Sequence, residues 1–145
     1  MIEANEFGAV AMSSAGVVYA GGPRTIAVSA DQMNWYQWPC PLNEIDGLHV
    51  DGGLLAIVGD DLFAVSEIRH QGKLWQAVDV KGATCVHIAS GRRAFVGTSK
   101  GRLCEFEIKR PRGLLERLGL GRAMTSPAIF PIGEWEAEPC GLEES

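Results

Sequence analysis

A 38-residue internal repeat is the feature of this sequence that most limits how it can fold. The segments 18–21 (VYAG), 56–59 (AIVG) and 94–97 (AFVG) follow one another at a constant step of 38 residues. An apolar strand-like segment precedes each of them at the same step, at 10–12, 48–50 and 86–88. Self-similarity at this period indicates a chain built from stacked supersecondary units.

Each copy of the repeat has the pattern of an antiparallel β-meander. Glycine-containing turns separate its first two strands, at 13–16, 51–53 and 90–91, and a third strand follows at 25–29, 62–66 and 102–106. A fourth, aromatic strand closes the first two copies at 35–38 and 74–78, and the third copy lacks it. One such meander cannot bury both of its faces, so it must stack on a neighbour. The sequence therefore predicts an all-β fold of three propeller-like blades.

One glycine ends the second strand of every copy, as Gly21, Gly59 and Gly97. A glycine at this point permits a tight turn and a close approach of backbones near the crowded axis of a blade stack. We expect these three residues to have a structural role.

A turn motif in the first copy resembles that of a known propeller family. Ser29, Asp31 and Trp35 fit the Ser-x-Asp-(Gly)-x-x-Trp box of BNR-type propellers and of the related photosynthesis-assembly-factor propellers. Gln32 stands where glycine is usual, and the second and third copies lack the motif. The resemblance covers residues 7–108 and concerns the fold. It implies that the Asp caps a turn through backbone N–H groups and that the Trp packs between blades.

The sequence changes character after the repeats, which divides the chain into a blade domain at 1–110 and a C-terminal segment at 111–145. Leu114, Leu115 and Leu118 lie on one face of a short helix bounded by proline and glycine. A helix this short is not stable alone. It must pack either on its own domain or on a partner.

Residues 123–145 read as an extended docking arm, because three prolines prevent long regular structure. The apolar residues Ile129, Phe130, Ile132 and Trp135 alternate with other residues enough to form an added strand. The charges change along the chain: residues 1–91 hold four Lys/Arg against ten Asp/Glu, 92–122 nine against three, and 123–145 none against five. Such blocks either pair within or between chains, or form solvated faces.

A catalytic constellation is absent from the sequence, which predicts that the chain is not an enzyme and uses no cofactor. His49 and His87 occupy the same repeat position, which allows either a metal or ligand site or simple packing. His70 lies in a polar segment that reads as a solvated hairpin turn. The four cysteines have no metal-binding spacing and read as buried, reduced thiols: Cys40, Cys85, Cys104 and Cys140.

The composition is that of a globular protein, with 46% hydrophobic and 21% charged residues. A net charge of −5 argues against a general nucleic-acid binder. No window approaches the length of an apolar membrane span, and the acidic N-terminus lacks the features of a signal peptide. We therefore expect the chain to be cytoplasmic at synthesis.

Three blades are fewer than a closed propeller needs, so the stack has two open flanks. Either the C-terminal segment supplies a divergent fourth blade, or a second subunit closes the ring, or the flanks dock on other proteins. This predicts a non-catalytic structural or adaptor subunit with protein partners, a homo-oligomeric state, or both. The chain is similar to small blade proteins among bacteriophage tail and virion components, which implies incorporation into a virion. Two alternatives remain open: a glycan-binding or sialidase-like module that uses the aromatic strand around Trp38, and an assembly factor of the photosynthesis-factor type.

Overall fold

The computed structural model describes residues 7–90, 92–109 and 128–136, which form three four-stranded antiparallel sheets. Blade 1 contains β1 (Ala9–Met12), β2 (Val18–Gly22), β3 (Thr25–Ser29) and β4 (Tyr36–Pro39). Blade 2 contains β5 (Gly47–Asp51), β6 (Leu54–Gly59), β7 (Leu62–Glu67) and β8 (Gln76–Asp79), with a short 3₁₀ helix η1 (Ile68–His70) after β7. Blade 3 contains β9 (Ala83–Ala89), β10 (Arg93–Thr98), β11 (Arg102–Lys109) and β12 (Ala128–Glu136). The predicted all-β fold of three antiparallel blades is confirmed.

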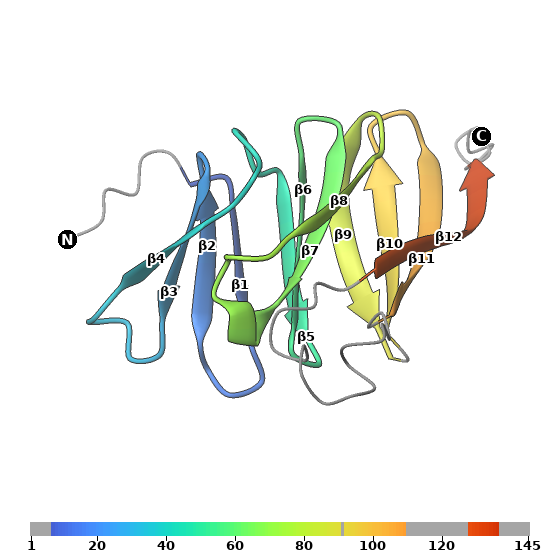
Figure 1. Cartoon of the computed structure of the whole chain (residues 1–145). Helices are drawn as coiled ribbons and strands as arrows, with labels where there is room; N and C mark the ends of the chain where they lie inside the picture. The colour runs from blue at the N-terminus through green and yellow to red at the C-terminus, as the bar shows by residue number, and fades with distance from the viewer. Residues whose placement is uncertain (1–6, 91, 110–127, 137–145) are drawn as a thin grey trace, which may run out of the picture.

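The three blades stand side by side in chain order, as Figure 1 shows. The first strands of successive blades are neighbours, since β5 lies against both β1 and β9. This arrangement places the inner strands along a common axis and buries one apolar layer between each pair of blades. Strand pairing alone does not bury these faces, so the stacking of blades creates the core.

The fourth strand of blade 3 comes from the C-terminal part of the chain, so the expectation that the third copy lacks one is wrong. β12 pairs antiparallel with β11 from Lys109↔Ala128 to Arg102↔Glu136. The register shifts between Glu105 and Phe106, and the proline-containing β12 tolerates this bulge because it is the edge strand. The alternation predicted for the arm thus belongs to a strand of the blade. The predicted helix, with Leu114, Leu115 and Leu118, lies outside the described residues.

The 38-residue step relates equivalent positions of the inner strands, which are the first strands β1, β5 and β9 of the three blades. It does not do so for the second strands. Tyr19 pairs with Ala11 and Phe95 pairs with His87, whereas Ile57 pairs with Leu48. The cause is the length of the first hairpin loop, which spans five residues in blade 1, two in blade 2 and three in blade 3. A slip of one residue moves a strand's side chains to the opposite face. Tyr19 and Phe95 therefore face the next blade, and Ile57 faces the preceding one.

Two apolar clusters fill the spaces between the blades. The cluster between blades 1 and 2 joins Tyr19, Ile26 and Val28 to Leu48, Val50, Leu55, Ile57 and Ala64. The cluster between blades 2 and 3 joins Ala56, Val58, Phe63 and Val65 to Ile88, Ala94, Val96, Cys104 and Phe106. Phe63 and Phe106 meet across the second interface with ring centroids 5.2 Å apart. Each cluster is formed by two faces. One is the face of a blade that points towards the next blade in chain order, which we call its forward face. The other is the face of that next blade that points back, which we call its backward face.

The structure contradicts two predictions about which side chains are buried, at His70 and at Cys85. His70 is buried rather than solvated, because η1 folds the segment after β7 back onto the protein. Cys85 is exposed, because its side chain lies on the face of blade 3 that has no following blade among the described residues. Cys40 and Cys104 are buried free thiols, as predicted, and burial raises the pKa of both. Cys140 lies outside the described residues.

Candidate functional site

The candidate site of this protein is the pair of faces at the two ends of the blade stack. The first outer face is the backward side of blade 1 and carries Val10 and Met12 on β1. The last outer face is the forward side of blade 3. Its residues lie in two cross-strand rows, Cys85–Gly97–Leu103–Trp135 and His87–Phe95–Glu105–Gly133.

Residues on the first outer face are exposed at positions that the other blades bury. Met12 is equivalent to Val50 and Ile88 on the inner strands, at the step of 38 residues. Val50 and Ile88 are 7% and 3% exposed inside the stack, whereas Met12 is 66% exposed. The same holds for Val10, which is 68% exposed against 8% for its equivalent Leu48. Blade 1 therefore has an apolar contact surface without a described neighbour.

The last outer face shows the same contrast. Leu103 is equivalent to Ile26 and Phe63, since all three pair through the second strand to the same inner-strand position. Ile26 and Phe63 are completely buried against the next blade, and Leu103 is 40% exposed. Trp135 occupies the row position of Trp38 and is half exposed. Each end of the stack thus presents the residues of an interior interface.

The two equivalent histidines show how neighbouring inner strands meet. The imidazole rings of His49 and His87 stack with centroids 4.4 Å apart. Nδ1 of His49 accepts the backbone N–H of Ile88 at 2.9 Å, so this histidine links blade 2 to blade 3. Burial, with a contribution from His87, lowers the pKa of His49. His87 holds the same position on blade 3, in a row of the last outer face, and is an exposed residue.

An ion pair between a buried carboxylate and a half-exposed guanidinium lies on the last outer face. The carboxylate of Glu105 pairs with the guanidinium of Arg93, which also lies 5.8 Å from the ring centre of Phe95. Glu105 is buried because its neighbour across the strands is Gly133, over which the indole of Trp135 lies. This charge is therefore compensated within the chain, which allows the face to be covered without leaving an unpaired ion.

Hydrogen bonds to the carboxylate of Asp31 and to the hydroxyl of Ser29 hold the turn in blade 1 that carries the box motif, which we call the box-like turn. Oδ1 of Asp31 accepts the backbone N–H groups of Met33 at 2.9 Å and Asn34 at 2.8 Å, and the Ser29 hydroxyl accepts the N–H of Gln32 at 2.8 Å. The bonds from Asn34 and Met33 hold the pKa of Asp31 far below its usual value. Trp35, the last residue of the motif, is half-buried. These contacts close the turn between β3 and β4.

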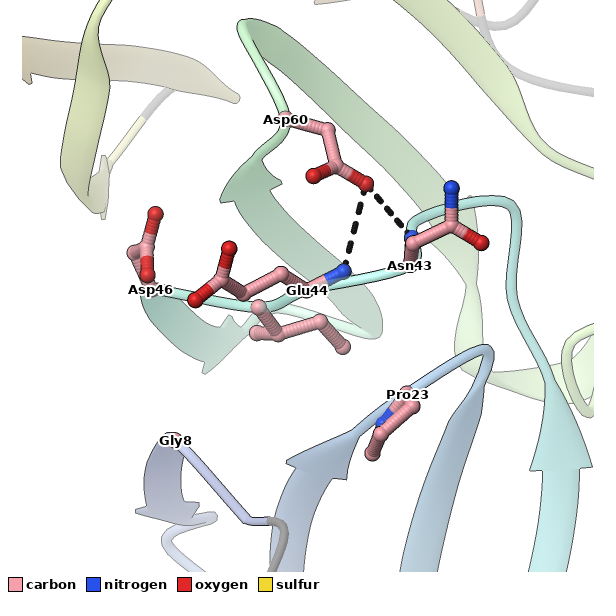
Figure 2. A pocket seen from close by; sticks show the side chains of 7 residues that line it. Gly8, Pro23, Asn43, Glu44, Asp46 and Asp60 are labelled. Atoms are coloured by element: carbon pink, nitrogen blue, oxygen red, sulfur yellow. Dashed lines mark hydrogen bonds between the residues drawn. The ribbon is translucent and has the colours of Figure 1, made fainter.

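A shallow hollow lies between blades 1 and 2, beside the segment that connects β4 to β5 (Figure 2). Its wall carries three carboxylates, from Glu44, Asp46 and Asp60. Oδ2 of Asp60 accepts the backbone N–H groups of Asn43 at 2.6 Å and Glu44 at 3.2 Å, which Figure 2 shows as dashed lines. Asp60 therefore fixes the segment that connects the two blades, and the hollow has a structural explanation.

The three predicted glycines lie where other atoms approach the backbone closely. A Cβ at Gly59 would overlap the carbonyl oxygen of Glu44 in the segment between blades. At Gly21 it would lie 2.8 Å from the side chain of Ile45, and at Gly97 it would lie 2.7 Å from the sulfur of Cys85. Gly21 and Gly59 leave space for the connection between blades 1 and 2, whereas Gly97 leaves space within blade 3.

The predicted interaction residues are distributed over different surfaces. Trp38 is half-buried, with its ring packed edge-on against Tyr19 at a centroid distance of 5.9 Å. Ile129 is half-buried and packs on the cluster between blades 2 and 3. Phe130 and Trp135 are half exposed on β12. The sequence reasoning did not single out Val10, Met12 or Leu103, although the repeat alignment of the inner strands could have identified the first two.

Within the described ranges, no three His, Cys, Asp or Glu side chains are grouped in a way that would hold a metal ion. The search for membrane spans likewise finds no helix of sufficient length and apolar character in this part of the chain.

Comparison with solved structures identifies the architecture. Hsv2 from Kluyveromyces lactis matches with a TM-score of 0.67 and 13% identity, over 92% of this chain and 48% of that one. A chain of the mitotic checkpoint complex matches with a TM-score of 0.60 and 14% identity, over 95% of this chain and 39% of that one. Both are β-propeller proteins, so this chain has the fold of propeller blades and spans about half the length of the structures it matches. No family model and no curated protein matches the sequence.

Proposed function

We propose that this protein is a non-catalytic propeller-type interaction module, which acts as a structural or adaptor subunit of a larger assembly. The contrast at Val10 and Met12 carries the proposal: both are exposed where their equivalents in the other blades are buried. Full burial of a Val or Met side chain gains about 1.5–3 kcal/mol. Covering these two residues, each about two-thirds exposed, would therefore gain roughly 1–2 kcal/mol apiece.

The polar groups support a non-catalytic role. Asp31 and Asp60 use their carboxylates to hold backbone N–H groups, and Glu105 is paired with Arg93. His49 accepts a backbone N–H from the next blade. These four side chains thus have structural partners. The matched chain of the mitotic checkpoint complex is likewise part of a multi-protein assembly.

The particular assembly that we propose is a bacteriophage virion or tail, by analogy with small blade proteins that carry docking arms. The mass of the native complex in the producing cell or in purified virions tests this identity. The alternative of a glycan-binding surface at Trp38 has less support, because that indole packs against Tyr19.

The module itself is tested by disrupting the first outer face. Affinity purification of the tagged chain from its native source should recover defined partner chains, and Met12→Glu should abolish their recovery. Met33→Glu is the matched control, because Met33 is 82% exposed but lies in the box-like turn, away from the inner strand. Equal recovery with both variants would show that the first outer face is not the interaction surface.

A further inference from the structure

We propose that the partner of this chain is a second copy of itself, and that two copies close a ring of six blades. In this dimer the last outer face of each copy packs against the first outer face of the other. The inference rests on the proposed function, since it names the occupant of the same two surfaces.

The two outer faces match one another as the interior faces do. Between blades 1 and 2, the forward residues Tyr19 and Ile26 contact a layer that contains Val50 of the next blade. Phe95 and Leu103 hold the positions of Tyr19 and Ile26 on blade 3, as the strand pairings establish. Met12 holds the position of Val50. Blade 1 of a second copy would therefore continue the stack with the contacts that already join blades 1 and 2.

The histidine link also continues across the proposed interface. His87 and Met12 are the equivalents of His49 and Ile88, whose backbone N–H is bonded to His49 Nδ1. The Ser13 N–H bonds to Val17 on the β2 side. Because successive N–H groups of a strand point to opposite edges, the Met12 N–H points to the free inner edge. There it is positioned to donate to His87 of the other copy.

Two copies would suffice to close the ring. The chain spans 48% of the length of the matched Hsv2 propeller, so two chains supply about one propeller's length. The first and last outer faces are different surfaces, so their contact is heterologous, and such contacts form rings when the rotation closes. In a dimer with two-fold symmetry the contact between a last and a first outer face forms twice, and no outer face remains exposed.

Charge is compatible with this interface. The charged pair on the last outer face, Arg93 and Glu105, is satisfied within its own chain. The first outer face opposes it with the exposed side chains of Val10 and Met12 and the half-buried Val18, which carry no charge. Covering the pair therefore requires no compensating ion from the second copy.

The test is the mass of the purified chain in solution, measured by sedimentation equilibrium over a range of concentrations. We expect twice the 15.6 kDa chain mass. Met12→Glu would bury an unpaired charge, so it should weaken the dimer at least about 100-fold while leaving the circular dichroism spectrum unchanged. Met33→Glu should leave the dimer intact.

A rescue variant distinguishes direct apposition from a general loss of structure. The double variant Met12→Glu/His87→Lys places opposite charges at the two positions that the dimer brings together, so it should recover at least about tenfold of the lost affinity. A folded wild-type monomer, a larger or open-ended polymer, or a double variant no tighter than Met12→Glu would each overturn the second-copy proposal. If the chain is monomeric but still loses native partners through Met12→Glu alone, only the identity of the partner is wrong and the interaction module stands.

Discussion

The position shared by Ile26 and Leu103 allows a direct test of how blade stacking produces stability. Both residues occupy the same place in a blade, and replacing either by alanine removes the same number of carbon atoms. Ile26 is completely buried against blade 2, whereas Leu103 is 40% exposed on the last outer face. Their cost to the free energy of unfolding should therefore differ because of the neighbouring blade alone.

The magnitudes follow from burial. Ile26→Ala leaves a cavity in the cluster between blades 1 and 2, which should cost about 2–5 kcal/mol. Leu103→Ala removes carbons that are only about three-fifths buried. Each fully buried methylene contributes about 0.8 kcal/mol, so these carbons contribute proportionally less. Water can also enter the space that they leave. The cost of this variant in the isolated chain should be roughly 1–1.5 kcal/mol.

Urea unfolding followed by tryptophan fluorescence measures both values, at chain concentrations low enough to keep the protein monomeric. Raising the concentration should increase the cost of Leu103→Ala, because association adds to the stability of the wild type. Equal costs for the two variants at low concentration would refute the reasoning, since they would mean that the last outer face is already covered within one chain.

Three further predictions concern single groups. Gly59→Ala should destabilise the protein by about 1–3 kcal/mol or prevent folding, because the added carbon meets the carbonyl of Glu44; thermal unfolding measures the change. Asp31 has a lowered pKa in the folded state, so its stabilising effect is full above its usual pKa of about 4 and is lost as the pH falls towards its folded value. Asp31→Asn should therefore reduce the acid-side slope of stability against pH, and an unchanged slope would contradict this role. His49 also has a lowered pKa, so the unfolded chain binds its proton first and stability should fall as the pH drops below about 6.5. In His49→Gln this dependence should be weaker in urea unfolding between pH 8 and pH 5.

The repeat determined much of the architecture at the level of sequence. Alternating apolar residues and glycine turns are local signals, so the strands of blades 1 and 2 could be placed from sequence alone. The inner strands kept the 38-residue step in the structure as well. The repeat alignment makes Met12 equivalent to Val50 and Ile88. It therefore already indicated an apolar contact position on the first blade.

Only the tertiary structure decided which face each second strand presents. The first hairpin loops differ in length, so Tyr19 and Phe95 face forward while Ile57 faces backward despite their equal sequence spacing. The sequence of these strands does not show which residues face forward and which face backward. A strand that is buried on both faces is apolar on both, so it has no polar side to mark its orientation. The stacking of blades supplies the missing information.

The tertiary structure also decided which residues are covered. β12 completes blade 3 from 18 residues beyond β11, and no local signal connects the two strands. Cys85 and Leu103 belong to apolar strands that sequence reasoning would bury, and they are exposed because blade 3 ends the described stack. Strand formation depends on neighbours in the chain, whereas burial depends on neighbours in space, and the latter exist only once the blades have stacked.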